Sequence, residues 1–300
     1  MLPSSAAATK YRSWWISMFG IACEFITSGN EQRKEEVLET AISSGDSESV
    51  MRTTHSTQAM TTRNRKDGIT IRKSAERGHA EHGWLDSKHT FSFGGYHDSD
   101  HMGFRSLRVI NQDRVRPGAG FPTHPHRDME IFSYVIDGAL EHRDSMGNGS
   151  ILKPGQIQLM SAGSGVTHSE FNPSANDPLH FLQIWIHPRE KGLEPSYTEW
   201  SPSAESESDA RALVISPDGR NGSARIRQDA EVWRIRLEPG DEVSHHLVDG
   251  RGLWLQVIDG PVRLNEATLG AGDGARAETD GEYRLVAGEV PVEALLFDLR

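Results

Sequence analysis

From Gly68 onward, short runs of hydrophobic and β-branched residues alternate with turn-forming residues, and long helical periodicities are few. This rhythm is typical of a β-sandwich or barrel. In the first half it predicts strands over residues 106–111, 129–136, 139–142, 156–160 and 180–186, with a hairpin turn at Asp137-Gly138. In the second half it predicts strands over residues 231–237, 253–258, 283–286 and 292–298.

The strand rhythm is interrupted between Pro195 and Asp209, a segment rich in Ser, Glu and Pro. We interpret this segment as a linker between two all-β domains. The first domain then covers residues 68–195 and the second covers residues 210–300. A chain of 300 residues is long enough for two such domains, each with its own core.

The first 67 residues differ in character from the rest of the chain. They contain one apolar run, residues 14–26, which is interrupted by Glu24 and too short to span a bilayer. A basic stretch precedes this run, as in a signal peptide, but no small-residue cleavage site follows it. We interpret residues 1–67 as a disordered extension, or as upstream codons read as protein with translation starting at Met60.

Charge and cysteine content narrow the possible partners. The formal net charge of −11 disfavours nucleic acid and anionic membranes as partners, because both repel an acidic surface. The single cysteine, Cys23, excludes an intramolecular disulfide and fits a cytoplasmic location. Imidazole and carboxylate groups remain as candidate metal ligands, and eleven of the fourteen histidines lie between His79 and His187.

Two pairs of polar residues have the spacing of metal ligands on strands. Residues i and i+2 of a strand point to the same face, so His124 can act with His126, and His168 with Glu170. A single H-x-H pair in a histidine-rich chain is more often structural than metal-binding. A second such pair favours metal binding over a structural role and indicates a site of three imidazoles and one carboxylate. We interpret the remaining histidines, including His142, as structural or surface residues.

The two halves also resemble a repeat. Pro117-Gly118 is followed by His124 six residues after the glycine, and Pro239-Gly240 is followed by His246 at the same distance. Extending this register replaces the other three candidate ligands by apolar residues: Val248 for His126, Leu285 for His168 and Ala287 for Glu170. The second domain is therefore expected to lack a metal site. Its adjacent histidines, His245 and His246, would point to opposite faces of a strand and could not chelate an ion.

The first pair lies in a segment that resembles cupin motif one, G-x5-H-x-H-x3-E-x6-G, with one extra residue before Gly138. The second resembles motif two, which ends H-x3-N at His168 and Asn172. More narrowly, the chain resembles the pirin family in six segments: RGH (77–79), GWLDS (83–87), HTFSF (89–93), THPH (123–126), EHRDSMG (141–147) and HSEFN (168–172). The second half matches this family mainly in overall pattern.

This resemblance implies two tandem cupin domains, each a jelly-roll β-barrel, with metal in the N-terminal barrel only. The ligands carried over are His124, His126, His168 and Glu170. Glu130 would lie near the site as a neighbour of the ligands. The cofactor would be one divalent transition metal; iron is expected, and zinc, manganese, nickel and copper also suit this ligand set.

Bacterial pirins similar to this chain are associated with quercetin 2,3-dioxygenase activity, in which O2 opens a flavonol and carbon monoxide is released. Glu170 would then serve as a ligand or as the base that takes the substrate's hydroxyl proton. The alternative is a non-catalytic, metal- or redox-sensing protein that binds a transcription factor or a metabolic enzyme.

Overall fold

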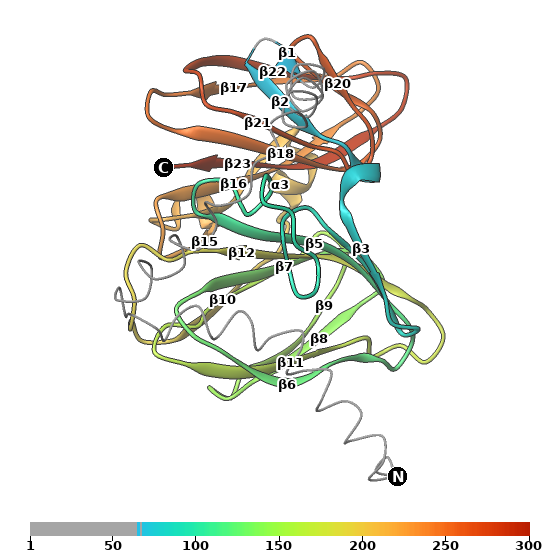
Figure 1. Cartoon of the computed structure of the whole chain (residues 1–300), viewed down its shortest axis with the longest axis vertical. Coiled ribbons are helices and arrows are strands. Elements are labelled where there is room, and N and C mark those ends of the chain that lie inside the picture. The colour runs from blue at the N-terminus through green and yellow to red at the C-terminus, as the bar shows by residue number, and fades with distance from the viewer. Residues whose placement is uncertain (1–64, 67) are drawn as a thin grey trace, which may run out of the picture. The chain divides into compact units, whose positions relative to one another are not determined.

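The computed structural model describes Arg65, Lys66 and residues 68–300. Its strands form four mainly antiparallel sheets, which are arranged as two barrels of two sheets each (Figure 1). The predicted all-β fold with two tandem barrels is confirmed. Cys23 and the apolar run of residues 14–26 lie outside the described residues. None of the described helices has the length and apolar character that a membrane span requires.

The first barrel consists of a seven-stranded sheet and a four-stranded sheet. In spatial order, the larger sheet contains β13 (Ser196–Trp200), β10 (Ile157–Ser161), β7 (Glu130–Asp137), β12 (Leu179–Ile186), β5 (Leu107–Val115), β4 (Leu85–His89) and β3 (Gly78–Glu81). The smaller sheet contains β6 (Gly120–His126), β11 (Val166–Phe171), β8 (Leu140–Asp144) and β9 (Gly149–Leu152).

The second barrel consists of an eight-stranded sheet and a four-stranded sheet. The larger sheet contains β1 (Arg65–Lys66), β2 (Ile69–Arg72), β21 (Gly274–Ala277), β18 (Gly252–Asp259), β23 (Val292–Leu299), β16 (Ala230–Leu237), β14 (Arg211–Ser216) and β15 (Ala224–Arg225). The smaller sheet contains β17 (Glu242–Leu247), β22 (Gly281–Ala287), β19 (Val262–Leu264) and β20 (Ala267–Leu269). Two 3-10 turns, Ser74–Glu76 and Arg220–Gly222, complete the regular structure with the short helix α3 (Ala204–Ser208).

Each predicted strand is present, but the predicted hairpin at Asp137-Gly138 is wrong. Strand β7 pairs with β10 and β12, whereas β8 pairs with β9 and β11 in the opposite sheet. The chain therefore crosses from one sheet of the barrel to the other at this turn. Both strands bury side chains on the face that points into the barrel, and crossing between sheets lets both faces contribute to one interior.

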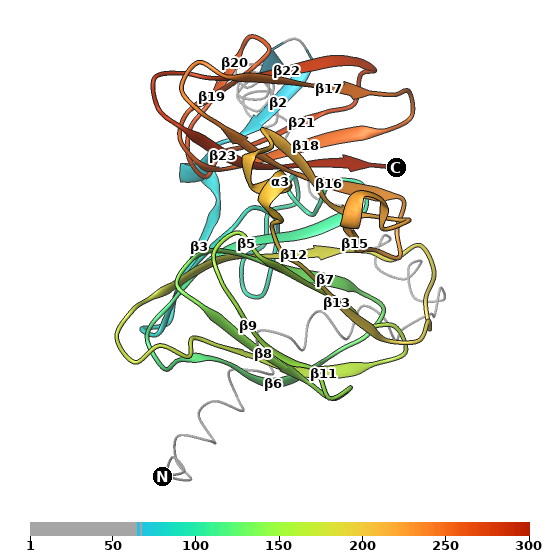
Figure 2. The ribbon, with the colours of Figure 1, turned by 180° about the vertical axis from the view of Figure 1, so that it is seen from behind.

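Two segments differ from their expected places. Strand β2 pairs with β21 and buries Ile69 in the core of the second barrel, although it precedes the first (Figure 1). The interdomain segment also contains regular structure, because β13 covers the edge of β10 and buries Trp200. Helix α3 follows β13 and lies beside the junction of the barrels (Figure 2). In both cases a sheet edge is covered and an apolar side chain is removed from water.

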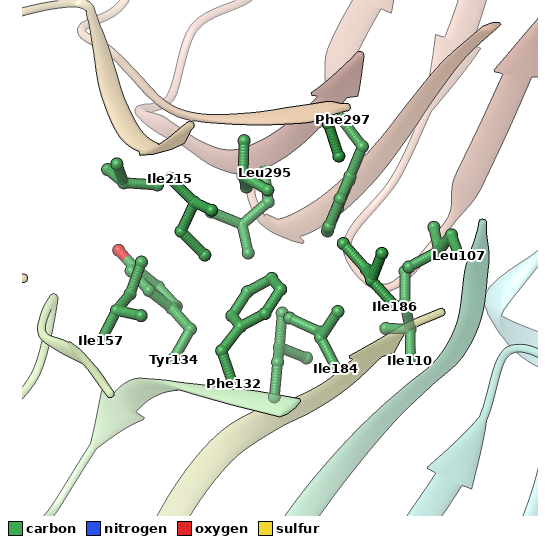
Figure 3. Close-up of a cluster of buried hydrophobic side chains, with 14 of the residues drawn as sticks. Leu107, Ile110, Phe132, Tyr134, Ile157, Ile184, Ile186, Ile215, Leu295 and Phe297 are labelled. Carbon is green, nitrogen blue, oxygen red and sulfur yellow. The ribbon is translucent and has the colours of Figure 1, made fainter. Parts of the chain in front are cut away.

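The larger sheets of the two barrels pack against each other through one hydrophobic cluster. Phe132 and Ile184 project from the first barrel toward Leu295 and Phe297 of the second (Figure 3). The rings of Phe132 and Phe297 lie 6.3 Å apart. Because alternate residues of a strand face opposite sides, each strand of this seam has one face toward the other barrel and one toward its own interior. The seam therefore leaves the interior of the first barrel free for polar residues.

Candidate metal centre

Three histidines converge inside the first barrel from two neighbouring strands. His124 and His126 lie on β6, His168 lies on β11, and the strands pair with His168 opposite His124. All three side chains are buried. The Nε2 atoms of His124 and His168 are 3.0 Å apart, and one candidate ligand atom from each of the three residues lies within 4.8 Å of the others. The strand geometry predicted from the sequence therefore brings these three residues together.

The imidazoles are in the form that a metal requires. Burial lowers the pKa of His124 to about 4 and holds the pKa values of His126 and His168 well below the ordinary value. The rings are therefore neutral at pH 7, and each has one unprotonated nitrogen. The Nδ1 of His124 lies 2.8 Å from the carbonyl of Pro122, which can only accept, so the proton is on Nδ1 and Nε2 is unprotonated.

Glu170 lies on the same face of β11 as His168 and is 1% exposed. Its Oε1 accepts hydrogen bonds from Ser133 Oγ (2.7 Å) and Gln158 Nε2 (2.9 Å), and its Oε2 accepts one from Gln183 Nε2 (2.5 Å). Two carboxylate oxygens offer about four acceptor positions, so one position on Oε2 remains for a further ligand. Burial raises the pKa of Glu170 to about 7.

The charge of Glu170 supports a cation in this place. Among the described residues, no arginine or lysine forms an ion pair with it, although a buried carboxylate is costly without a cationic partner. Two nitrogen ligands at right angles on one ion lie about 3 Å apart, since each bond is about 2.1 Å. The spacing of His124 and His168 matches this value. A divalent transition metal held by His124, His126 and His168 therefore fits the residues present. The ligand atoms of these three residues lie together, whereas Glu170 is grouped with His142 and His168 and not with all three histidines.

Glu130 is not brought to this cluster. It shares a face of β7 with Phe132, which packs in the seam between the barrels, whereas Ser133 on the other face contacts Glu170. Its Oε2 accepts hydrogen bonds from Ser161 Oγ (2.7 Å) and from the backbone nitrogen of Arg227 (3.1 Å). Glu130 therefore joins the two halves of the chain, and the expectation that it neighbours the ligands is not met.

Four further buried polar residues lie near the ligands, and the sequence patterns do not single them out. Ser133, Gln158 and Gln183 orient Glu170, and His142 lies 3.4 Å from His168 between their Nδ1 atoms. The first three interrupt otherwise apolar strands at positions that face the barrel interior. A polar residue at an inward-facing position of an apolar strand could have been recognised from the sequence. His142, expected to be structural or at the surface, is completely buried and forms an alternative ligand group with His168 and Glu170.

The second barrel lacks such a cluster among its described residues. His245 is buried and bonds Asp298 Oδ2 (2.8 Å), whereas His246 is exposed, so the two histidines do point to opposite faces. The proposed repeat register is wrong on β17, since His124 is buried and its supposed counterpart His246 is not. On β22, Leu285 and Ala287 are buried in the core, as His168 and Glu170 are in the first barrel.

Comparison with known proteins agrees with the fold of two tandem domains. Residues 70–186 match the family model described as Pirin, and residues 213–299 match the model described as Quercetinase C-terminal cupin domain. The chain is 46% identical over 231 residues to quercetin 2,3-dioxygenase of Escherichia coli K12, covering 77% of this chain and 98% of the relative.

Two crystal structures from Escherichia coli are similar to this chain. One is that of YhhW (46% identity, TM-score 0.75, covering 77% of this chain and 97% of that one). The other is described as the bacterial pirin YhhW in complex with nickel(II) (45% identity, TM-score 0.73, covering 77% of this chain and 98% of that one).

Proposed function

The chain belongs to the pirin family, and on this premise we propose that it is a metal-dependent dioxygenase that opens flavonols such as quercetin. The observation that carries the proposal is the buried group of three neutral imidazoles in the first barrel, with the buried carboxylate of Glu170 on the same strand face as His168. The relative from Escherichia coli named quercetin 2,3-dioxygenase supports the reaction class, and the nickel complex of YhhW supports metal binding.

In this proposal the residues divide into two roles. His124, His126 and His168 hold the metal through neutral nitrogens, and the hydrogen bond to Pro122 fixes the orientation of His124. Glu170, oriented by its three donors, either completes the ligand set or accepts the 3-hydroxyl proton of the flavonol at Oε2. In the metal-free protein, burial raises the pKa of this carboxyl group to about 7, so it can take up and release a proton near neutral pH. When bound, the metal supplies the Lewis-acid and redox chemistry that the reaction with O2 needs.

We propose iron as the metal of this centre. Nitrogen and carboxylate ligands without thiolate suit iron, and they suit nickel, zinc, manganese and copper as well. Elemental analysis of protein purified without added metal distinguishes these cases. One metal ion per chain is expected in wild type and much less in His126→Ala. Glu190→Gln, which changes an exposed carboxylate, is the matched control and should keep the ion.

The activity is tested by adding quercetin to metal-loaded protein without O2 and then admitting O2. We expect a change in the quercetin spectrum on binding and release of carbon monoxide after O2 is admitted. Wild-type protein that holds its metal and yields neither signal would refute the dioxygenase proposal. That result would favour the alternative, a metal-dependent regulatory protein, which a comparison of protein partners bound by wild type and His126→Ala would then examine.

A further inference from the structure

A second row of buried polar residues extends from the metal site into the neighbouring strand β8. His142 and Asp144 both lie on β8, which pairs with β11 so that Asp144 is opposite His168 and His142 is opposite Glu170. The side chains of His142 and Asp144 are inaccessible to solvent. A buried histidine and a buried carboxylate are costly unless each has a specific partner, so their contacts indicate their role.

These contacts can form a chain of hydrogen bonds in which each proton is donated in the same direction, from His168 through His142 to Asp144. His168 has Nε2 toward His124, so its Nδ1 is the nitrogen that faces His142, at 3.4 Å from His142 Nδ1. When Nε2 of His168 binds a metal, its proton is on Nδ1 and can be donated to Nδ1 of His142. The proton of a neutral His142 is then on Nε2, which lies 3.3 Å from Oδ2 of Asp144, a group that accepts.

The far end of this chain is anchored by the backbone. Asp144 accepts hydrogen bonds from the backbone nitrogens of Met146 (2.9 Å) and Asn148 (3.0 Å) and from Asn148 Nδ2 (2.9 Å). The ring of Tyr197 stacks on His142, with centroids 5.0 Å apart and planes inclined by 22°. The position of His142 is therefore fixed on one side by a rigid turn and on its face by an aromatic ring.

We propose that Asp144 and His142 form a buried relay of hydrogen bonds that orients His168 and strengthens it as a metal ligand. Both are positioning residues, and the inference rests on the proposed metal site. Carboxylate–histidine–metal arrangements have this effect because the hydrogen bond fixes the tautomer and makes the ligating nitrogen more basic. A metal bound by His142, His168 and Glu170 is the competing arrangement. It would use the nitrogen of His168 that faces away from His124.

Two substitutions at His142 separate hydrogen bonding from packing. His142→Asn places an amide oxygen near the position of Nδ1, so it keeps the acceptor for His168 and loses the ring. His142→Phe keeps a ring that can stack on Tyr197 and loses the acceptor. Asp144→Asn, which has nearly the same shape as the native residue, removes the charge at the end of the relay and gives a third measurement if either change at His142 impairs folding.

The measurement is the dissociation constant for Ni²⁺ of the full chain, determined by competition with a chelator, with the number of ions per chain and the melting temperature of the metal-free protein. We expect one ion per chain, binding weakened about 10- to 100-fold in His142→Phe, an intermediate loss in Asp144→Asn, and binding closer to wild type in His142→Asn.

Three results would overturn the relay. If His142→Phe and Asp144→Asn both bind Ni²⁺ as tightly as wild type, the relay does not strengthen the metal site. The proposed function would still stand in that case, because the wild-type protein binds the metal. A larger loss in His142→Asn than in His142→Phe would show that His142 acts by packing. Loss of the bound ion in every His142 variant, with retention in His124→Ala, would favour the competing arrangement. Wild type that binds no Ni²⁺ would instead remove the proposed metal site itself.

Discussion

Glu170→Gln is expected to stabilise the metal-free protein at alkaline pH while it weakens metal binding. The native carboxylate is fully buried, and burial raises its pKa from an ordinary value of 4.5 to about 7. The folded protein therefore binds this proton more tightly than the unfolded chain does. Between these two pKa values the stability of the metal-free protein falls as the pH rises.

The size of the effect follows from this pKa difference. A difference of that size corresponds to about 3 kcal/mol of destabilisation at pH 8, where the carboxyl group is ionised in both states, and to about 1 kcal/mol at pH 5. The amide that replaces the carboxylate has one acceptor oxygen for three donors, so the substitution also costs about 1 kcal/mol in lost hydrogen bonding at either pH. The free energy of unfolding of Glu170→Gln, measured relative to wild type, should therefore rise by about 2 kcal/mol between pH 5 and pH 8.

Urea unfolding of chelator-treated wild type and Glu170→Gln at pH 5 and pH 8 measures this change. Glu190→Gln, at an exposed carboxylate, is the control and should show no pH-dependent difference from wild type. The same effect of Glu170→Gln at both pH values, or a greater relative stability at pH 5, would refute the reasoning. Titration with Ni²⁺ at pH 8 should raise the melting temperature of wild type more than that of the variant, because a neutral amide is a weaker ligand.

Three further predictions concern other parts of the molecule. Phe132→Ala should lower the free energy of unfolding by about 3–5 kcal/mol, because Phe132 is fully buried in the seam; a loss below about 1 kcal/mol in urea unfolding would contradict this. Burial lowers the pKa of His180 from 6.5 to about 4, so the unfolded chain takes up a proton here more readily than the folded protein does. The stability that the neutral ring provides is therefore present above pH 6.5 and is lost as the pH falls toward 4. His180→Gln should flatten the fall in melting temperature over that range, and an unchanged slope would exclude His180 as its cause. Gly163→Ala should lower the melting temperature, because φ is +45° and the added Cβ would overlap the carbonyl of Leu193, whereas Gly288→Ala has open space and should have little effect.

The strands and the principal site residues could be predicted from the sequence because both depend on short-range order. Alternation with a period of two sets which face a residue occupies, and this placed His124 with His126 and His168 with Glu170. The same alternation separated His245 from His246. The pairing of β6 with β11 then depended on the family resemblance, because spacing within a strand does not determine which strands are neighbours.

Strand neighbours and the partners of buried polar groups were decided only by the tertiary structure. The turn at Asp137-Gly138 could join a hairpin or carry the chain to the opposite sheet, and the shared interior of the barrel selected the second. Glu130 points to the seam because Phe132, two residues along, is buried there. His142 reaches His168 only because β8 pairs with β11. The sequence by itself therefore determined which residues could bind a metal. The long-range packing of strands decided which residues surround them and how each ligand is held.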